Sequence, residues 1–308
     1  MIDLTVIICT HNRSELLVSA IDSINAAERP DKCNLKILVI ANACSDDTVT
    51  KLREYQYHQS QNNDLPLLFE EELRPGKSYA LNHAVHCVET GFLCFMDDDQ
   101  RIDKNYLIAI VKAVAEHPNA TLFCGPLFPD WQGNEPKWIH ETGKFRIYPL
   151  PVPEFNLGSS TIEIERENQT PPGGQVIIRK DVFNRIGFFS ENLGPRGHNL
   201  VGSEDTEFFL RAIGLGESFL YSPTIIQYHF VDPNRLKLSY LLRNSYQRNR
   251  SLTSITRQSK GIPLFLYSKL TNYVLSAIFC FSSNKIRYYL IRSACILGQI
   301  AGHRDTTL

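Results

Sequence analysis

Three consecutive aspartates, Asp97, Asp98 and Asp99, follow the apolar run FLCFM at residues 92–96. Neighbouring carboxylates repel one another, and partial burial at a strand end strengthens that repulsion. Alternate residues of an extended chain point the same way, about 6.6 Å apart, so Asp97 and Asp99 can converge on one ligand. Mg²⁺ and Mn²⁺ take carboxylate ligands of this kind together with substrate phosphates. The motif indicates a metal–diphosphate site, and the alternative is a solvated acidic loop.

Strands and helices alternate around this motif. Continuous apolar runs at residues 4–8, 35–40 and 92–96 have the length of buried strands, and amphipathic segments of helical period separate them. Such strands are typical of a parallel sheet covered on both faces, in which ligands bind at the carboxyl ends of the strands. The polar clusters THNR, ANACSDD and DDDQ follow these strands. We therefore predict an α/β fold with a mostly parallel twisted sheet flanked by helices, and a site at its carboxyl edge.

Charge is divided unevenly along the chain. The net charge is −1, but Met1–Asp232 hold 20 basic and 32 acidic side chains, whereas Pro233–Arg304 hold 12 basic and no acidic ones. The apolar run at residues 262–281 is interrupted by Lys269 and Asn272. This mixture is typical of helices that lie in a membrane interface. We predict a helical extension over residues 233–308 that contacts an anionic membrane, with packing of a helical hairpin onto the sheet as the alternative. Nucleic acid is not expected as a partner.

Cysteines and the N-terminus bear on location. The eight cysteines are scattered without a C-x-x-C pair, and Cys9 and Cys94 lie within apolar runs. They are expected to be buried thiols in a reducing compartment. The segment MIDLTVIICT has no basic stretch before its apolar run, so no signal peptide is predicted. A cytoplasmic location, at the cytoplasmic face of a membrane, is expected.

Several blocks of the sequence occur in a characteristic order. They are VIICTHNRSELLVSAIDSI, ILVIANACSDDT, RPGKSYALNHA, FLCFMDDDQ and GGQVIIRKDVFNRIGFFSENLG, followed by GSEDTEFFLRAIGLG and SPTIIQYH. In this order and spacing they resemble the family-2 glycosyltransferases of GT-A fold, over roughly residues 4–229. The resemblance implies a nucleotide-sugar donor, a divalent metal on its diphosphate, and a glycan or lipid-linked acceptor.

The resemblance assigns the nucleotide site to the N-terminal half. Thr10 and Asn12 would lie beside the nucleotide, and Asn42 and Asp47 in the loop that recognises the base. Ala41 stands where an acidic residue is common in the family, yet Asn42 can still pair with uracil, so UDP is the expected nucleotide. The resemblance implies that Asp97 binds the ribose and that Asp98 lies next to it in the nucleotide site. Arg74 and Lys77 would either contact the diphosphate or belong to a solvated loop.

The same resemblance assigns the metal and the chemistry. Asp99 and His229 would hold Mn²⁺ or Mg²⁺, with a satisfied core histidine as the alternative for His229. Asp205 would be the general base of an inverting transfer, and Glu204 would contact the acceptor or support the base. Helix capping is the alternative for Asp205, since a carboxylate at a helix N-terminus is stabilised by the helix dipole.

Three further residues are assigned to the sugars. Gly173 and Gly174 would pass close to the donor sugar and the acceptor, with an ordinary turn as the alternative. Trp138 would offer a stacking platform for a sugar ring, with loop packing as the alternative.

The resulting organisation is a catalytic domain over residues 1–232 and the extension over 233–308. Residues 1–105 would bind the nucleotide and residues 106–232 the acceptor, with long loops over about 126–172. A dehydrogenase is excluded because CTHNRS contains no G-x-G-x-x-G. A non-catalytic, membrane-associated glycan-binding or scaffold protein of the same fold is the alternative function.

Overall fold

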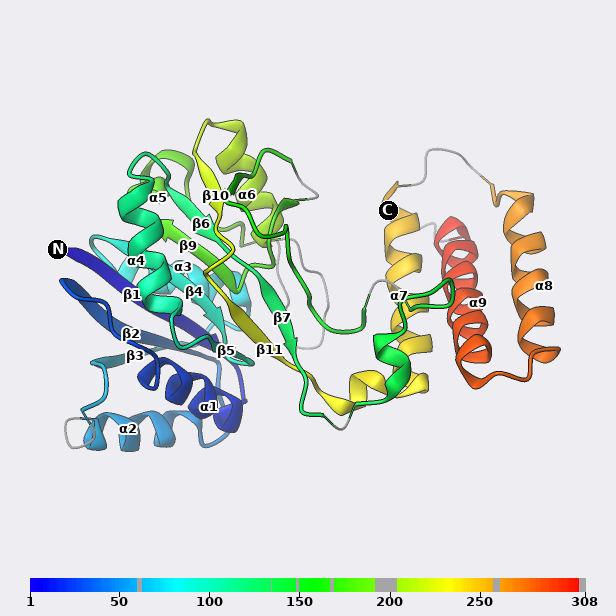
Figure 1. Ribbon diagram of the computed structural model, residues 1–308, viewed down its shortest axis with the longest axis horizontal. Helices are drawn as coiled ribbons and strands as arrows, with labels where there is room; N and C mark the ends of the chain where they lie inside the picture. The colour runs from blue at the N-terminus through cyan, green and yellow to red at the C-terminus, as the bar shows by residue number, and fades with distance from the viewer. Residues whose placement is uncertain are drawn as a thin grey trace. The chain divides into compact units, whose positions relative to one another are not determined.

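The computed structural model describes residues 1–59, 63–133, 135–147, 150–166, 169–191, 204–256 and 261–304. The chain divides into two compact units (Figure 1). Unit 1 comprises Met1–Asp130 and Pro153–Phe230, and unit 2 comprises Trp131–Val152 and Val231–Leu308. Residues 131–152, which were expected in the catalytic domain over residues 1–232, belong to unit 2.

Unit 1 is built on a mixed sheet that has eight strands in the described part of the chain, in the order β3-β2-β1-β4-β9-β6-β10-β8. Strands β3, β2, β1 and β4 are parallel neighbours, as are β6 and β10, while β9 runs antiparallel between β4 and β6. The strands are β1 (Ile2–Thr10), β2 (Cys33–Asn42), β3 (Leu67–Glu72), β4 (Phe92–Asp97), β6 (Leu122–Cys124), β8 (Ile162–Glu163), β9 (Gln175–Arg179) and β10 (Phe219–Tyr221). The predicted mostly parallel α/β sheet is confirmed.

Helices cover both faces of this sheet because its strands are apolar on both faces. In β1, Val6 and Ile8 belong to a buried cluster that includes Ile21 of α1, whereas Ile7 belongs to a second cluster that includes Phe208 of α6. The helices of unit 1 are α1 (Ser14–Asn25), α2 (Thr48–His58), α3 (Lys77–Cys87), α4 (Tyr106–Glu116), α5 (Val182–Ile186) and α6 (Glu204–Gly214). Alternate side chains of a strand point to opposite faces, so one strand serves both layers.

A second, three-stranded sheet in the described residues has the order β5-β11-β7. It consists of β5 (Gln100–Ile102), β7 (Leu127–Asp130) and β11 (Gln227–Phe230). Antiparallel pairing of β11 with β5 sets His229 opposite Gln100, directly after the three aspartates. This register brings two segments about 130 residues apart in sequence to one point.

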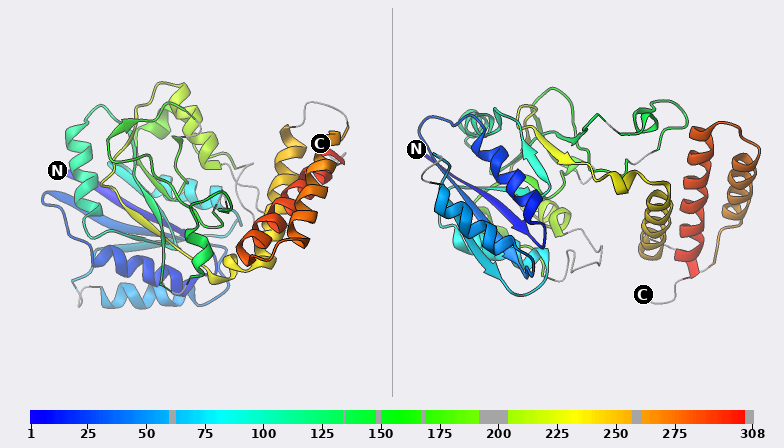
Figure 2. Two further views of the ribbon diagram at one scale, coloured as in Figure 1. Left: turned by 45° about the vertical axis from the view of Figure 1, so that its right-hand side comes forward. Right: turned by 90° about the horizontal axis from the view of Figure 1, so that it is seen from below.

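Unit 2 is mainly helical (Figure 2). Two short 3-10 helices, η1 (Lys137–His140) and η3 (Pro233–Leu236), accompany α7 (Leu238–Thr256), α8 (Leu264–Ile278) and α9 (Ser283–Arg304). Helices α7 and α9 cross closely, since a Cβ on Gly298 would lie 2.2 Å from the carbonyl oxygen of Tyr246. The helical C-terminal extension is thus confirmed. Searched over the described residues, none of these helices combines the length and apolarity that crossing a bilayer requires.

Candidate functional site

A cavity of about 340 Å³ opens at the carboxyl ends of β1, β2 and β4 in unit 1. The carboxyl edge of the sheet is where the sequence predicted a site. Seven predicted site residues line it: Thr10, Asn42, Lys77, Asp97, Asp98, Asp99 and His229.

The three aspartates are held together by two cations of the chain. The guanidinium of Arg13 donates to Asp98 at 3.0 Å and to Asp99 at 3.1 Å, and the Nζ atom of Lys77 donates to Asp97 at 2.8 Å. Opposite charges at this distance offset much of the repulsion between the carboxylates. Arg13 was missed by the sequence reasoning, although it is the only Lys or Arg in the turn THNR.

Burial and charge shift the proton affinities of this cluster. Burial raises the pKa of Asp98 to about 6, although Arg13 and the hydroxyl of Thr10 oppose the shift. Burial would also raise the pKa of Asp97, but the ammonium of Lys77 outweighs it and holds that pKa below its usual value. Burial would lower the pKa of Lys77, and the carboxylates of Asp97, Glu204 and Asp205 raise it instead. Asp97 and Lys77 therefore form a charged pair, whereas Asp98 gains a proton in mildly acidic solution.

His229 and Asp99 fit two ligands of a divalent cation. The Nε2 atom of His229 lies 3.4 Å from Oδ1 of Asp99, and Nδ1 lies 2.8 Å from the carbonyl oxygen of Phe230. A carbonyl oxygen only accepts, so Nδ1 donates its hydrogen to Phe230 and Nε2 faces the carboxylate of Asp99. A proton or a metal ion can lie between Nε2 and Oδ1. Within the described ranges, no cluster of three or more His, Cys, Asp or Glu side chains suits a metal, so further ligands would have to come from phosphate and water.

Two adjacent glycines separate the aspartate cluster from Asp205. A Cβ on Gly174 would lie 2.4 Å from the carboxylate of Asp97, and one on Gly173 would lie 2.7 Å from Oδ2 of Asp205. The N–H of Gly173 donates to Oδ2 of Asp205 at 2.6 Å. Because adjacent Cα atoms are about 3.8 Å apart, the carboxylates of Asp97 and Asp205 lie within about 12 Å of each other. The predicted base and the predicted nucleotide cluster are therefore neighbours.

Glu204 and Asp205 form the first turn of α6, and residues 192–203 before them lie outside the described residues. The side chain of Glu204 is buried, and its Oε2 has no hydrogen-bond partner among the described residues. Burial raises the pKa of Glu204, Lys77 opposes this, and the carboxylate of Asp205 adds to it. An unpartnered buried carboxyl oxygen is costly unless a proton or a ligand meets it.

The remaining predicted nucleotide residues hold loops next to the cavity. The amide of Asn42 donates to the carbonyl oxygens of Glu72 and Arg74 and accepts from the N–H of Gly76. Oδ1 of Asn12 accepts from the N–H groups of Ser45 and Asp46. Both amides thus fix the backbone around the site.

Asp47 and Arg74 do not line the cavity. Asp47 accepts from the hydroxyl of Ser14 at 2.6 Å and pairs with Lys51, and Arg74 pairs with the buried Glu72. Their contacts with a nucleotide stay predictions.

Trp138 belongs to unit 2. It is 8% exposed, and the guanidinium of Arg287 lies 4.7 Å from its ring centroid. Its role as a sugar platform stays a prediction.

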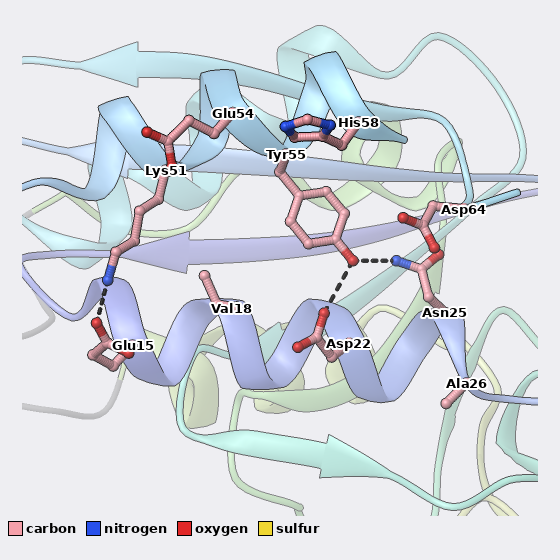
Figure 3. A pocket seen from close by; sticks show the side chains of 10 residues that line it. All are labelled: Glu15, Val18, Asp22, Asn25, Ala26, Lys51, Glu54, Tyr55, His58 and Asp64. Carbon is pink, nitrogen blue, oxygen red and sulfur yellow. Dashed lines mark hydrogen bonds and ion pairs between the residues drawn. The ribbon is translucent and has the colours of Figure 1, made fainter. Parts of the chain in front are cut away.

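A larger cavity of about 700 Å³ lies between α1 and α2 and contains none of the predicted site residues (Figure 3). Its polar groups bond to one another: the hydroxyl of Tyr55 donates to Asp22 and accepts from Asn25, and Lys51 pairs with Glu15. The cavity at the carboxyl edge is therefore the candidate active site.

A family model described as glycosyl transferase family 2 matches residues 5–187. The chain is 22% identical over 306 residues to the succinoglycan biosynthesis protein ExoM of Rhizobium meliloti, covering 96% of this chain and 91% of that protein. It is 22% identical over 250 residues to the glucosyl-dolichyl phosphate glucuronosyltransferase of Haloferax volcanii, covering 80% of this chain and 75% of that protein.

Among solved structures, the mannosyltransferase PcManGT from Pyrobaculum calidifontis, in complex with GDP-Man and Mn²⁺, is similar at a TM-score of 0.58. The two sequences are 17% identical, and the match covers 97% of this chain and 85% of that chain. This likeness confirms the predicted fold.

Proposed function

The chain belongs to glycosyl transferase family 2, so it is a glycosyltransferase, and we propose that it moves a sugar from a nucleotide-sugar donor to an acceptor hydroxyl with inversion at the anomeric carbon. The main support for this mechanism is that Gly173 lies against Asp205 and the adjacent Gly174 lies against Asp97. It puts a proton acceptor next to the cluster that would hold the donor.

The donor would occupy the cavity at the carboxyl edge. Thr10, Asn42 and Asp97 would face the nucleoside, and Arg13 and Lys77 would offer positive charge to the diphosphate. UDP is the proposed nucleotide. The PcManGT complex contains GDP-Man, so the base is a question for the experiment below.

Asp99 and His229 would hold Mn²⁺ or Mg²⁺, because Nε2 and Oδ1 face each other at 3.4 Å. When bound, the cation supplies positive charge that stabilises the departing diphosphate. Arg13 donates to Asp98 and Asp99 and so keeps both carboxylates oriented toward the cavity.

Asp205 would act as general base. It removes the proton from the acceptor hydroxyl while the hydroxyl oxygen forms a bond to the anomeric carbon. The bond from that carbon to the diphosphate oxygen breaks, and the diphosphate leaves with the electron pair. The N–H groups of Gly173 and Thr206 fix Oδ2 and Oδ1 of Asp205 at 2.6 and 2.7 Å. Glu204, buried beside it, would support the acceptor site.

The acceptor would be a glycan or a lipid-linked sugar, and the extension would contact an anionic membrane. The relative in Haloferax volcanii is named a glucosyl-dolichyl phosphate glucuronosyltransferase. Helix α8 and the turn after it leave large apolar side chains in water: Leu264 is 84% exposed, Ile278 66%, Phe279 74% and Phe281 101%. Apolar side chains on an acid-free, basic segment suit the interface of an anionic membrane.

A thermal-shift screen of UDP- and GDP-linked sugars, with and without Mn²⁺, tests the function. A ligand that binds only the folded state raises the melting temperature by mass action. We expect one donor to raise it, more strongly with Mn²⁺, and Asp99→Asn to remove the effect of Mn²⁺. If no donor shifts the melting temperature under either condition, the non-catalytic glycan-binding alternative is favoured.

A further inference from the structure

We propose that unit 2 carries an anion site of its own, which binds a phosphate or diphosphate group between α7, α9 and residues 144–147. A cavity of about 220 Å³ lies there, and all its lining residues belong to unit 2. None of them belongs to the donor site, so the two proposals stand or fall separately.

Positive charge surrounds this cavity, and the described residues that line it include no carboxylate. Lys144, Arg146, Arg248 and Arg292 line it. The like charges of Lys144, Arg248 and Arg292 repel one another, and an anion in the hollow reduces that cost.

The described acidic residues of unit 2 are engaged elsewhere. Glu135 pairs with His140, Glu141 accepts from Asn284, and Asp232 accepts from the N–H of Asn234. From Pro233 to Arg304 the sequence contains no Asp or Glu at all. Lys144, Arg248 and Arg292 therefore face no carboxylate from the described residues of α7, α8 or α9.

One guanidinium is oriented by aromatic rings. The Cζ atom of Arg292 lies 5.9 Å from the ring centroid of Tyr273 and 6.0 Å from that of Tyr288. Arg292 also donates a hydrogen bond to the hydroxyl of Tyr273, which uses one of its five N–H groups. The other N–H groups can make the bidentate contacts by which a guanidinium binds a phosphate. Arg248 reaches the same cavity from α7, the helix packed against α9.

The rest of the lining limits the size and class of the ligand. Ile147, Leu150 and Ile291 form an apolar wall, and Asn244 and Ser245 add uncharged polar groups. Pockets for drug-sized ligands measure about 300–1,000 Å³, so this hollow suits a phosphate or diphosphate rather than a whole nucleotide sugar. An apolar wall lowers the local dielectric and strengthens the attraction between the cations and the anion.

The test compares binding of inorganic diphosphate by isothermal titration calorimetry, in the presence of a chelator, to full-length variants. Arg248→Gln/Arg292→Gln should weaken binding at least 10-fold. Arg243→Gln is the matched control, because Arg243 is exposed on the same helix α7 but does not line the cavity, and it should bind as the wild type does. Melting temperatures measured without ligand should be unchanged, which verifies that the variants fold. If the double variant does not fold, the single variant Arg248→Gln replaces it in the binding measurement.

A second arm separates a free phosphate from a lipid headgroup. Cosedimentation uses phosphatidylcholine vesicles that contain either phosphatidic acid, with its phosphomonoester, or phosphatidylglycerol at matched charge. If the wild type prefers phosphatidic acid and the double variant loses this preference, the site binds a lipid headgroup. Loss of diphosphate binding alone assigns it to a soluble phosphate, and either result supports the site. The proposal is overturned if the double variant matches the wild type in both arms, or if Lys77→Gln in the donor cavity abolishes diphosphate binding.

Discussion

The backbone N–H of Gly173 donates to Oδ2 of Asp205 at 2.6 Å, and the next residue along the chain lies against the carboxylate of Asp97. One short stretch of backbone thus separates the proposed base from the cluster proposed for the donor. The lack of a side chain at Gly173 and Gly174 is what allows both carboxylates to approach so closely.

Adding one methyl group at either glycine should displace a carboxylate. A Cβ on Gly173 would lie 2.7 Å from Cβ of Asp205, and one on Gly174 would lie 2.4 Å from the carboxylate of Asp97. We expect Gly173→Ala and Gly174→Ala each to lower the transfer rate by about 100-fold, because a shift of about 1 Å in a reacting group has an effect of this size. The measurement is steady-state release of the nucleoside diphosphate. Gly214→Ala is the control, since nothing lies within 4 Å of its added Cβ, and a full rate in all three variants would refute the account.

Replacing His229 should lower the affinity of the protein for Mn²⁺. Because Nε2 of His229 faces Oδ1 of Asp99 at 3.4 Å, His229→Gln is expected to raise the Mn²⁺ concentration for half-maximal rate by about 10-fold or more. A Mn²⁺ titration of the rate measures this, with the exposed His86→Gln as control. An unchanged titration curve would make His229 a structural residue of β11.

Asp98 should make the stability of the protein depend on pH. Burial raises its pKa from 3.8 to about 6, so the folded protein binds this proton more tightly than the unfolded chain does. Its contribution is present below the unfolded pKa and is lost as pH rises toward about 6, at a cost of about 3 kcal/mol for two pKa units. Asp98→Asn removes this titration. Between about pH 4 and 6, urea unfolding should therefore show a smaller loss of stability in Asp98→Asn than in the wild type; parallel curves would refute the assignment.

The apolar surface of the extension should bind anionic vesicles. Phe279 and Phe281 are 74% and 101% exposed, and burial of one such side chain contributes about 1.5–3 kcal/mol. The double variant Phe279→Ser/Phe281→Ser is therefore expected to lower vesicle partitioning by about 100-fold or more in a sedimentation assay. Tyr57→Ser, at a position 72% exposed on α2 of unit 1, should leave it unchanged. Equal partitioning of both variants and the wild type would exclude membrane contact through this surface.

Local sequence patterns predicted the sheet well because its strands are apolar on both faces. The runs at residues 4–8, 35–40 and 92–96 all lie in parallel neighbours β1, β2 and β4. Of the two cysteines expected inside buried strands, Cys94 is buried and Cys9 is partly buried, and all eight cysteines are free. These features depend on residues that are close together in the sequence, and local patterns describe such residues.

Contacts between residues far apart in the chain could not be predicted from local sequence patterns. Arg13 pairs with residues 85 and 86 positions away, and no period or motif encodes that pair. Likewise, the register of β11 on β5 decides that His229 meets Asp99. The grouping of residues 131–152 with the C-terminal helices depends on packing of Trp138 with Leu236 and Ile291, which composition does not specify.

The most direct test of the proposed mechanism is the rate of sugar transfer by Asp205→Asn under conditions where the donor still binds. The amide can keep the hydrogen bond from Gly173 but cannot take up a proton, so binding should persist while the rate falls by about 100- to 10,000-fold. Asp31→Asn, at an exposed carboxylate of unit 1 that does not line the cavity, is the matched control and should keep most of the activity. A rate for Asp205→Asn within a few-fold of the wild type, with donor affinity unchanged, would contradict the account.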